Sequence, residues 1–218
     1  MPDSQTVATV RVTTIGLEGH LRCPPDPAGL IVFAHGAGSS HRSPRNNRVA
    51  GALAAQGFAT LLFDLLTEDE AQDRANVFDI PLLGQRMLDA LDWTWSQRPL
   101  RRLPVGLFGA STGAAAALVA AAQAPDRVGA VVSRGGRPDL AAGALPQVRA
   151  PVLLIVGGLD EVVVHLNLTA ADRLTCPHRT EIVPGATHLF EEPGALDRVT
   201  TLAGDWFTQH LSHAESRA

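Results

Sequence analysis

The sequence predicts an α/β protein with one open, mostly parallel, twisted sheet and helices on both faces. Its compact apolar runs lack period-two alternation, as expected for strands that are covered on both faces. These runs also alternate along the chain with helical patterns, which is typical of parallel α/β sheets. With 218 residues, 45% hydrophobic and 18% charged, the composition indicates a folded protein, and we expect a single domain over residues 1–218.

The strands are predicted from apolar runs in chain order. Val7–Val12 and Leu17–Arg22, separated by a turn at Gly16, predict an N-terminal antiparallel hairpin. The later runs, most of which end in glycine or a small polar residue, are Leu30–Ala34, Phe58–Phe63, Val105–Phe108, Val128–Val132, Val152–Val156 and Thr180–Val183. In such a sheet the functional residues gather at the carboxyl ends of the strands.

Helical patterns fill the gaps between these runs. Arg48–Gln56 is alanine-rich and stops at Gly57, Ile80–Ser96 has apolar residues at helical spacing, and Thr112–Gln123 is nearly all alanine. An apolar stripe between Leu196 and Leu211 predicts a C-terminal amphipathic helix. Only the segment 133–151 separates two of the late strands, which is too short for a multi-helix lid. We therefore expect no cap domain and an open site.

Composition excludes several classes of function. A net charge of −4 and a pI near 6.0 argue against a nucleic-acid partner. All 18 basic residues are arginine, so a phosphate-loop lysine and a Schiff-base lysine are both excluded. Cys23 and Cys176 are too few for a four-ligand zinc site. We expect neither a metal nor a cofactor.

The N-terminus and the length of the apolar runs predict where the protein is located. The first residues lack the basic-then-apolar pattern of a signal peptide, and no apolar run reaches about 18 residues. We expect a soluble cytoplasmic protein without a membrane partner. The sequence leaves open whether it is a monomer or a homodimer.

The segment 109–113, Gly-Ala-Ser-Thr-Gly, carries the predicted chemistry. It is a G-x-S-x-G motif that follows an expected strand and precedes an expected helix, and this is the setting that lifts a nucleophilic serine above the sheet edge. Ser111 is therefore the predicted nucleophile. The alternative is a tight turn with an incidental serine.

A serine nucleophile needs a base and an acid that orients the base. Of the eight histidines, His188 follows a late strand, and Asp160 follows the strand before it. The order Ser111, Asp160, His188 is that of α/β-hydrolase triads. Asp139 and Glu161 are competing acids because they lie near the same predicted rim.

The glycine-rich loop after the strand Leu30–Ala34 is the predicted oxyanion site. Its backbone offers the N–H of Ala37, and the residue after the nucleophile, Thr112, offers a second N–H. His35 is interpreted as a residue that shapes this loop. The loop lacks the third glycine of a dinucleotide-binding fingerprint.

Four motifs in this order make the sequence resemble the α/β-hydrolases, and within them the small dienelactone-hydrolase-like branch. The motifs are His-Gly-Ala-Gly at 35–38, Gly-Ala-Ser-Thr-Gly at 109–113, Gly-Gly-Leu-Asp at 157–160 and Gly-Ala-Thr-His at 185–188. The resemblance implies an acyl-enzyme mechanism with Ser111 as nucleophile, His188 as base and Asp160 as its orienting acid. Dienelactone hydrolases proper use a cysteine nucleophile, so Ser111 favours a serine esterase over dienelactone cleavage.

Charged loops surround the predicted site. Arg134 and Arg137 follow a strand end, where they can bind an anionic substrate group or, equally, Asp139 or a backbone carbonyl. The basic loop 41–48 and the acidic segment 68–79 are expected to pair across the rim. Asp64, which ends the strand Phe58–Phe63, is expected to be structural.

The leading hypothesis is a serine hydrolase that cleaves carboxylic esters or lactones of small soluble substrates. The alternatives are an acyltransferase or perhydrolase that uses the same triad, and a non-catalytic binding protein with the same fold.

Overall fold

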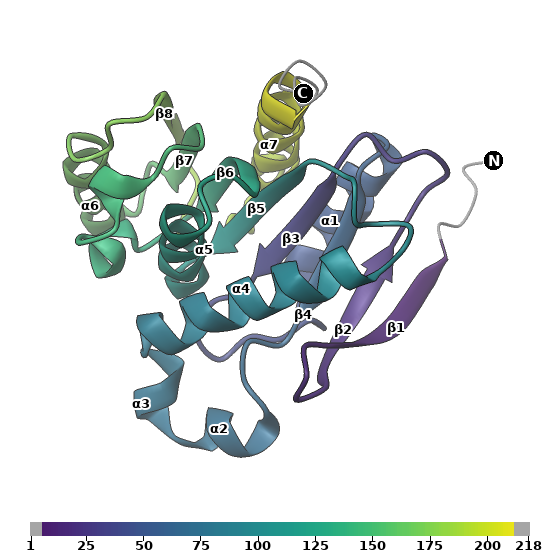
Figure 1. The fold of residues 1–218 in the computed structure, drawn as a ribbon. Coiled ribbons are helices and arrows are strands. Elements are labelled where there is room, and N and C mark those ends of the chain that lie inside the picture. Colours follow the sequence, from purple (N-terminus) through teal and green to yellow (C-terminus); the bar gives the residue numbers. More distant parts are fainter. Residues whose placement is uncertain (1–5, 212–218) are drawn as a thin grey trace.

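A computed structural model describes residues 6–211, and its centre is one eight-stranded sheet (Figure 1). The spatial order of the strands is β1-β2-β4-β3-β5-β6-β7-β8. The strands are β1 (Val7–Val12), β2 (Leu17–Arg22), β3 (Leu30–Ala34), β4 (Ala59–Phe63), β5 (Val105–Ala110), β6 (Val128–Arg134), β7 (Val152–Gly157) and β8 (His178–Val183). β1 pairs with β2 and β2 with β4 in antiparallel fashion, and every other pairing is parallel. The predicted fold class, with its N-terminal hairpin, is confirmed.

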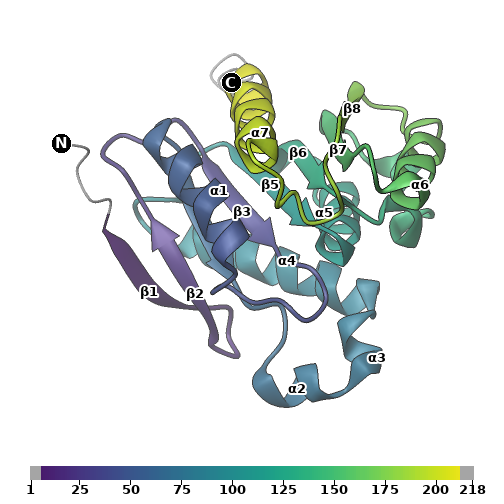
Figure 2. The ribbon, with the colours of Figure 1, turned by 180° about the vertical axis from the view of Figure 1, so that it is seen from behind.

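Helices cover both faces of the sheet. They are α1 (Pro44–Ala55), α2 (Glu68–Gln72), α3 (Arg74–Val77), α4 (Ile80–Ser96), α5 (Thr112–Gln123), α6 (Glu161–Ala171) and α7 (Ala195–Leu211). α1 and α7 lie side by side on one face, and α4 and α5 lie on the other (Figures 1 and 2). α2 and α3 lie beyond the sheet on the way from β4 to α4 (Figure 1).

The core follows the alternation of side chains along the strands. In β3, Ile31 and Phe33 pack in the cluster under α1 and α7, whereas Leu30 and Val32 pack in the cluster under α4 and α5. All four side chains are buried. Two apolar layers explain why the central strands are continuous apolar runs.

Element ends differ from the sequence expectations in ways that have local causes. α1 begins at Pro44 and not at Arg48, because Ser43 caps it by accepting from the N–H of Asn46 and proline is favourable in the first helical turn. The acidic segment expected as a rim loop contains α2, which begins with a capping box between Thr67 and Glu70.

The segment between β6 and β7 contains only two short 3-10 turns, η1 (Pro138–Ala141) and η2 (Leu145–Gln147). No cap domain is therefore inserted there, as the sequence predicts. Among residues 6–211 no helix has the length and apolarity needed to cross a bilayer.

The expected pairing between the basic loop 41–48 and the acidic segment 68–79 is wrong. Its arginines contact other acids: Arg42 contacts Glu18, Arg45 contacts Glu191 and Arg48 contacts Asp197. In the acidic segment Glu70 pairs with Arg86 of α4. Each of these three acids lies in a segment that is next to the loop in the folded protein. The order of charges along the sequence does not show which segments become neighbours.

Candidate active site

Ser111 lies in the sharp turn between β5 and α5. Its backbone φ of +52° is in the left-handed region, which is uncommon for a residue other than glycine. The turn is crowded: a Cβ on Gly36 would lie 2.9 Å from the Ser111 Cβ, and one on Gly113 would clash with the carbonyl oxygens of Ala34 and His35. Glycine is therefore required at both positions. Ser111 is the N-cap of α5, yet its side chain makes no capping hydrogen bond.

Backbone groups hold this strained turn. The Ser111 N–H donates to the Arg134 carbonyl oxygen at 3.2 Å. The Ser111 carbonyl oxygen accepts from the N–H groups of Ala114, at 3.1 Å, and Arg137, at 3.0 Å. The end of β6 and the loop after it thus fix the position of the serine through their main chain.

His188 and Asp160 form a short hydrogen-bonded pair on the same rim. His188 Nδ1 lies 2.6 Å from Asp160 Oδ2, and the two side chains are 38% and 18% exposed. Their loops are joined where the Leu159 N–H donates to the Ala186 carbonyl oxygen at 2.9 Å. With its Nδ1–H directed at the carboxylate, the imidazole keeps Nε2 available as a proton acceptor.

The hydrogen bonds among residues 6–211 do not include one between the Ser111 hydroxyl and His188. Such contacts are often long before substrate binds. The two acids that compete with Asp160 have different surroundings. Both carboxylate oxygens of Asp139 accept from the Arg137 guanidinium, at 2.9 and 2.7 Å. Glu161 is the first residue of α6.

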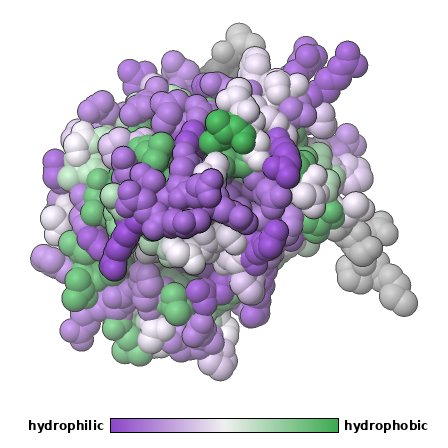
Figure 3. Space-filling model, turned by 90° about the horizontal axis from the view of Figure 1, so that it is seen from below, coloured by the Kyte–Doolittle hydropathy of each residue, from purple (hydrophilic) through white to green (hydrophobic). Residues whose placement is uncertain are grey.

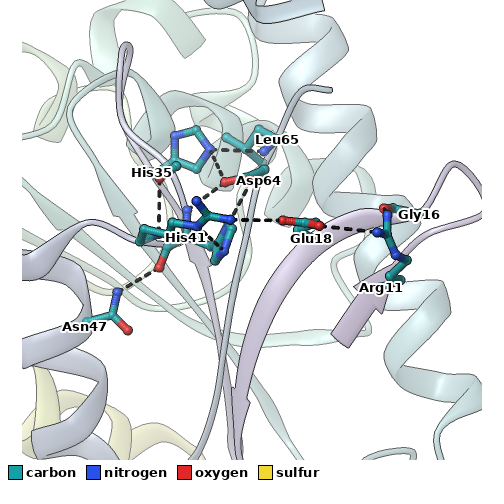
Figure 4. Close-up of polar contacts among 10 residues, drawn as sticks. Arg11, Gly16, Glu18, His35, His41, Asn47, Asp64 and Leu65 are labelled. Carbon is teal, nitrogen blue, oxygen red and sulfur yellow. Dashed lines mark hydrogen bonds and ion pairs between the residues drawn. The ribbon is translucent and has the colours of Figure 1, made fainter. Parts of the chain in front are cut away.

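The loop between β3 and α1, residues 35–43, is fixed against the end of β4 by two histidines (Figure 4). Asp64 accepts from the His41 N–H at 2.7 Å and from the His41 Nδ1–H at 2.8 Å. His35 Nε2 accepts from the Leu65 N–H at 3.1 Å, and its Nδ1 donates to the Gly36 carbonyl oxygen at 3.0 Å. The geometry agrees with a loop-shaping His35 and a structural Asp64.

Burial determines the protonation of His35. Desolvation lowers the pKa of His35 below its usual value, against the opposing effects of the Gly36 hydrogen bond and the Asp64 charge. A neutral ring is also required by the hydrogen bonds, because only an unprotonated Nε2 can accept from the Leu65 N–H.

The predicted oxyanion donors lie together, but one of them is already engaged. The Ala37 N–H donates to Thr112 Oγ1 at 2.9 Å. Thr112 is the first residue of α5, where the backbone N–H has no partner within the helix. The sequence predicts a role for the Thr112 backbone only, because the contact of its side chain with Ala37, 75 positions away, depends on how two loops fold.

A cavity of about 270 Å³ opens beside these donors. Its walls come from the loop 35–42, from the 64–68 segment after β4 and from Leu83 of α4. Leu65, Leu66 and Val77 contribute apolar surface, whereas His41 and Asp64 contribute polar atoms. The cavity thus offers mixed surroundings to a group bound next to Thr112.

The two predicted substrate-binding arginines have different surroundings. Arg137 is occupied by Asp139, which was one of the two alternatives left open. Arg134 is only 7% exposed, and its Nε and Nη1 atoms are buried without a hydrogen-bond partner. Burial and the nearby Arg45 charge lower the pKa of Arg134 to about 10.

The described residues contain no group of three or more His, Cys, Asp or Glu side chains arranged to hold a metal ion.

Curated relatives match most of the chain. Two Mycobacterium tuberculosis proteins, from strains CDC 1551 / Oshkosh and ATCC 25618 / H37Rv, are 57% identical to it over 197 residues. The match covers 90% of this chain and 44% of each relative, so the chain spans less than half the length of these proteins. Both carry a provisional phosphoribosyl transferase name.

Solved structures and a family model match over nearly the full length. A dienelactone hydrolase from Anabaena variabilis is 51% identical, with a TM-score of 0.89 over 94% of this chain and 97% of that one. Est1E from Butyrivibrio proteoclasticus shares the fold, with a TM-score of 0.79 at 16% identity over 93% and 98% of the two chains. The family model for dienelactone hydrolases matches residues 17–210. The chain therefore belongs to the dienelactone hydrolase family.

Proposed function

We propose that the protein is a serine hydrolase that cleaves carboxylic esters or lactones of small soluble substrates through an acyl-enzyme intermediate. The observation that carries the proposal is the hydrogen-bonded His188–Asp160 pair on the same sheet edge as Ser111, whose positive φ presents its side chain at the turn. A nucleophilic serine needs a strained strand-to-helix turn and a hydroxyl that is not used to cap the helix, and Ser111 has both.

In this mechanism Ser111 Oγ attacks the substrate carbonyl carbon while its proton passes to His188 Nε2. The C–O bond that forms and the carbonyl π bond that opens give a tetrahedral oxyanion. Collapse of the oxyanion breaks the bond to the alcohol, which leaves with the proton from His188. Water then repeats the sequence on the acyl-enzyme, releases the carboxylic acid and restores Ser111. Asp160 keeps the imidazole in the productive tautomer and stabilises its charged form.

Single substitutions separate these roles. We expect Ser111→Ala and His188→Ala each to lower ester hydrolysis by several orders of magnitude, and the double variant to resemble either single variant because the residues act as a unit. Asp160→Asn should lower kcat by a factor on the order of 10⁴, following the serine-protease precedent. The assay is hydrolysis of a p-nitrophenyl ester, with thermal unfolding as the check on folding.

Asp139→Asn and Glu161→Gln are the matched controls for the acid. Both should stay within about tenfold of wild type, which corresponds to ~1.4 kcal/mol. Near-normal activity in Asp160→Asn together with collapse in either control would falsify the assignment of the acid alone.

A fluorophosphonate probe distinguishes an enzyme from a binding protein with the same fold. Labelling should occur at Ser111 and be absent from Ser111→Ala. Absence of labelling and of ester turnover in the wild type would refute the hydrolase proposal. An added alcohol or peroxide acceptor then separates hydrolysis from acyl transfer and perhydrolysis, because those reactions change only the acceptor.

The name of the mycobacterial relatives describes proteins more than half of whose length lies outside the match. The residues that support the present proposal all lie inside the segment 17–210 that the dienelactone hydrolase family model matches.

A further inference from the structure

Thr112 has a hydroxyl whose hydrogen bonding is only half used. Its oxygen accepts from the Ala37 N–H at 2.9 Å, and among residues 6–211 its own proton has no acceptor. The residue is 3% exposed, yet it contributes to the wall of the 270 Å³ cavity. A hydroxyl that accepts one hydrogen bond retains one proton to donate. The free proton is therefore available to a group that binds in the cavity.

The covalent structure of threonine places two donors close together. The backbone N–H of Thr112 and its hydroxyl are separated by only the Cα and Cβ atoms. The N–H is free because it belongs to the first turn of α5, and the residue directly follows Ser111. A single oxygen atom bound beside Ser111 can accept from both groups of this one residue.

The Ala37 N–H, by contrast, is not free to turn toward substrate. The loop that carries it is fixed at both ends, where His35 accepts from Leu65 and His41 donates to Asp64 (Figure 4). Gly36 packs against Ser111 so closely that an added Cβ would lie 2.9 Å from the serine Cβ. Redirecting the Ala37 N–H would require loss of its bond to Thr112 and displacement of this anchored loop.

We propose that Thr112 supplies two donors to the oxyanion, its backbone N–H and its side-chain O–H, and that Ala37 acts through Thr112 by orienting the hydroxyl. This inference rests on the proposed serine-hydrolase function and makes the Thr112 side chain a catalytic residue. Donation from the Ala37 N–H also polarises the hydroxyl, since hydrogen bonds in a chain strengthen one another.

The test removes the hydroxyl at nearly constant size in Thr112→Val and retains it, without the methyl group, in Thr112→Ser. Thr112→Val should lower kcat for p-nitrophenyl acetate by about 10²–10³-fold, which is the loss measured for removal of one oxyanion donor. KM should change by less than about threefold, because the donor acts on the transition state more than on the bound ester. Thr112→Ser should retain kcat within about fivefold. Thr200→Val, the same change at a buried threonine of α7, should match wild type.

A trifluoromethyl ketone provides a second measurement, because its adduct with Ser111 carries the oxyanion. Its inhibition constant should rise in Thr112→Val in parallel with the loss of kcat. If Thr112→Val does not fold, Thr112→Ala removes the hydroxyl with a smaller side chain and is expected to show the same loss.

The outcomes separate this inference from the function on which it rests. More than a third of wild-type kcat in Thr112→Val would show that the Thr112 hydroxyl is not an oxyanion donor, and would overturn the inference. An equal loss in Thr112→Ser would assign the effect to packing and would also overturn it. Wild-type protein that neither turns over esters nor labels at Ser111 would instead overturn the proposed function.

Discussion

At the scale of single residues, the main chain and the side chain of Arg134 and of Arg137 make different contributions to this site. Arg134 and Arg137 support Ser111 through a carbonyl oxygen and an N–H. The Arg137 side chain is neutralised by Asp139, whereas the buried Arg134 side chain has unpartnered nitrogen atoms. An uncompensated buried charge is unfavourable. Of the two arginines, only Arg134 therefore remains a good candidate for contact with an anionic substrate group.

We predict that Arg134 favours esters that carry a second anionic group. In Arg134→Met, kcat/KM should fall at least about tenfold for an ester that carries a carboxylate, or ~1.4 kcal/mol. It should stay nearly constant for the neutral ester of matched size. Arg137→Met is the matched control and should leave the ratio of the two values unchanged. Equal responses of both substrates to Arg134→Met would make this arginine purely structural.

At the scale of elements, the site depends on how the loop between β3 and α1 is anchored to the end of β4. His35 and His41 lie near the two ends of this loop, and both contact the segment at Asp64 and Leu65. The sequence predicted a loop-shaping His35 because it lies upstream of the predicted donor Ala37 and because His188, after a late strand, fits the role of base better. It did not predict the partner of His41, because Asp64 is 23 positions away and the contact depends on how two loops fold.

The neutral form of His35 makes the stability of the protein dependent on pH. Because burial lowers its pKa in the folded protein, the unfolded chain binds the proton more readily. The stabilisation is therefore complete above the unfolded pKa of about 6.5 and is lost as the pH falls through the lower folded value. We predict that the free energy of unfolding decreases between pH 7 and pH 5, with a slope of at most about 1.4 kcal/mol per pH unit for this one proton.

Urea unfolding of wild type and His35→Gln measures this effect. Glutamine does not titrate, and its side-chain oxygen can accept from the Leu65 N–H, so the variant should show a shallower slope below pH 6.5. His20 also has a pKa lowered by burial, and it acts in the same direction. His20→Gln is therefore measured in parallel. Equal slopes in wild type and His35→Gln would show that His35 does not carry the effect.

At the scale of the whole molecule, the sequence predicted the fold class and the residues that follow the ends of the strands. Ser111, Asp160 and His188 were predicted as site residues because each follows an apolar run, and the parallel order β5-β6-β7-β8 brings these strand ends to one edge of the sheet. The pairing of Ala37 with Thr112 and the buried state of Arg134 were not found. Both depend on side-chain packing between segments that are far apart in sequence, which neither periodicity nor motif spacing encodes.

The surface around the site and the cavity together determine how much of an acyl chain can be buried. Figure 3 shows the side on which α2 and α3 lie as mostly hydrophilic, with hydrophobic groups scattered over it. The segment 133–151 adds only two short 3-10 turns to the rim. We therefore expect an acyl chain to be buried in the 270 Å³ cavity beside Thr112.

We predict that kcat/KM is highest for acyl chains of about two to six carbons. A methylene gains ~0.8 kcal/mol, roughly fourfold in kcat/KM, only where it is removed from water. Carbons beyond the cavity remain hydrated and add nothing. A series of p-nitrophenyl esters from acetate to dodecanoate should therefore rise over the first few carbons and then level or fall.

The cavity itself is tested by filling it. Ala71 of α2 contributes to its wall, and its exposed position should let Ala71→Phe project into the cavity without disturbing the core. The variant should lower kcat/KM for hexanoate more than for acetate, because only the longer chain needs the filled volume. Ala75→Phe, a change in the neighbouring α3 at a residue outside the cavity lining, is the control and should leave the ratio unchanged. A continuous rise out to dodecanoate in the wild type would contradict the prediction, since it would require a longer buried path than this cavity provides.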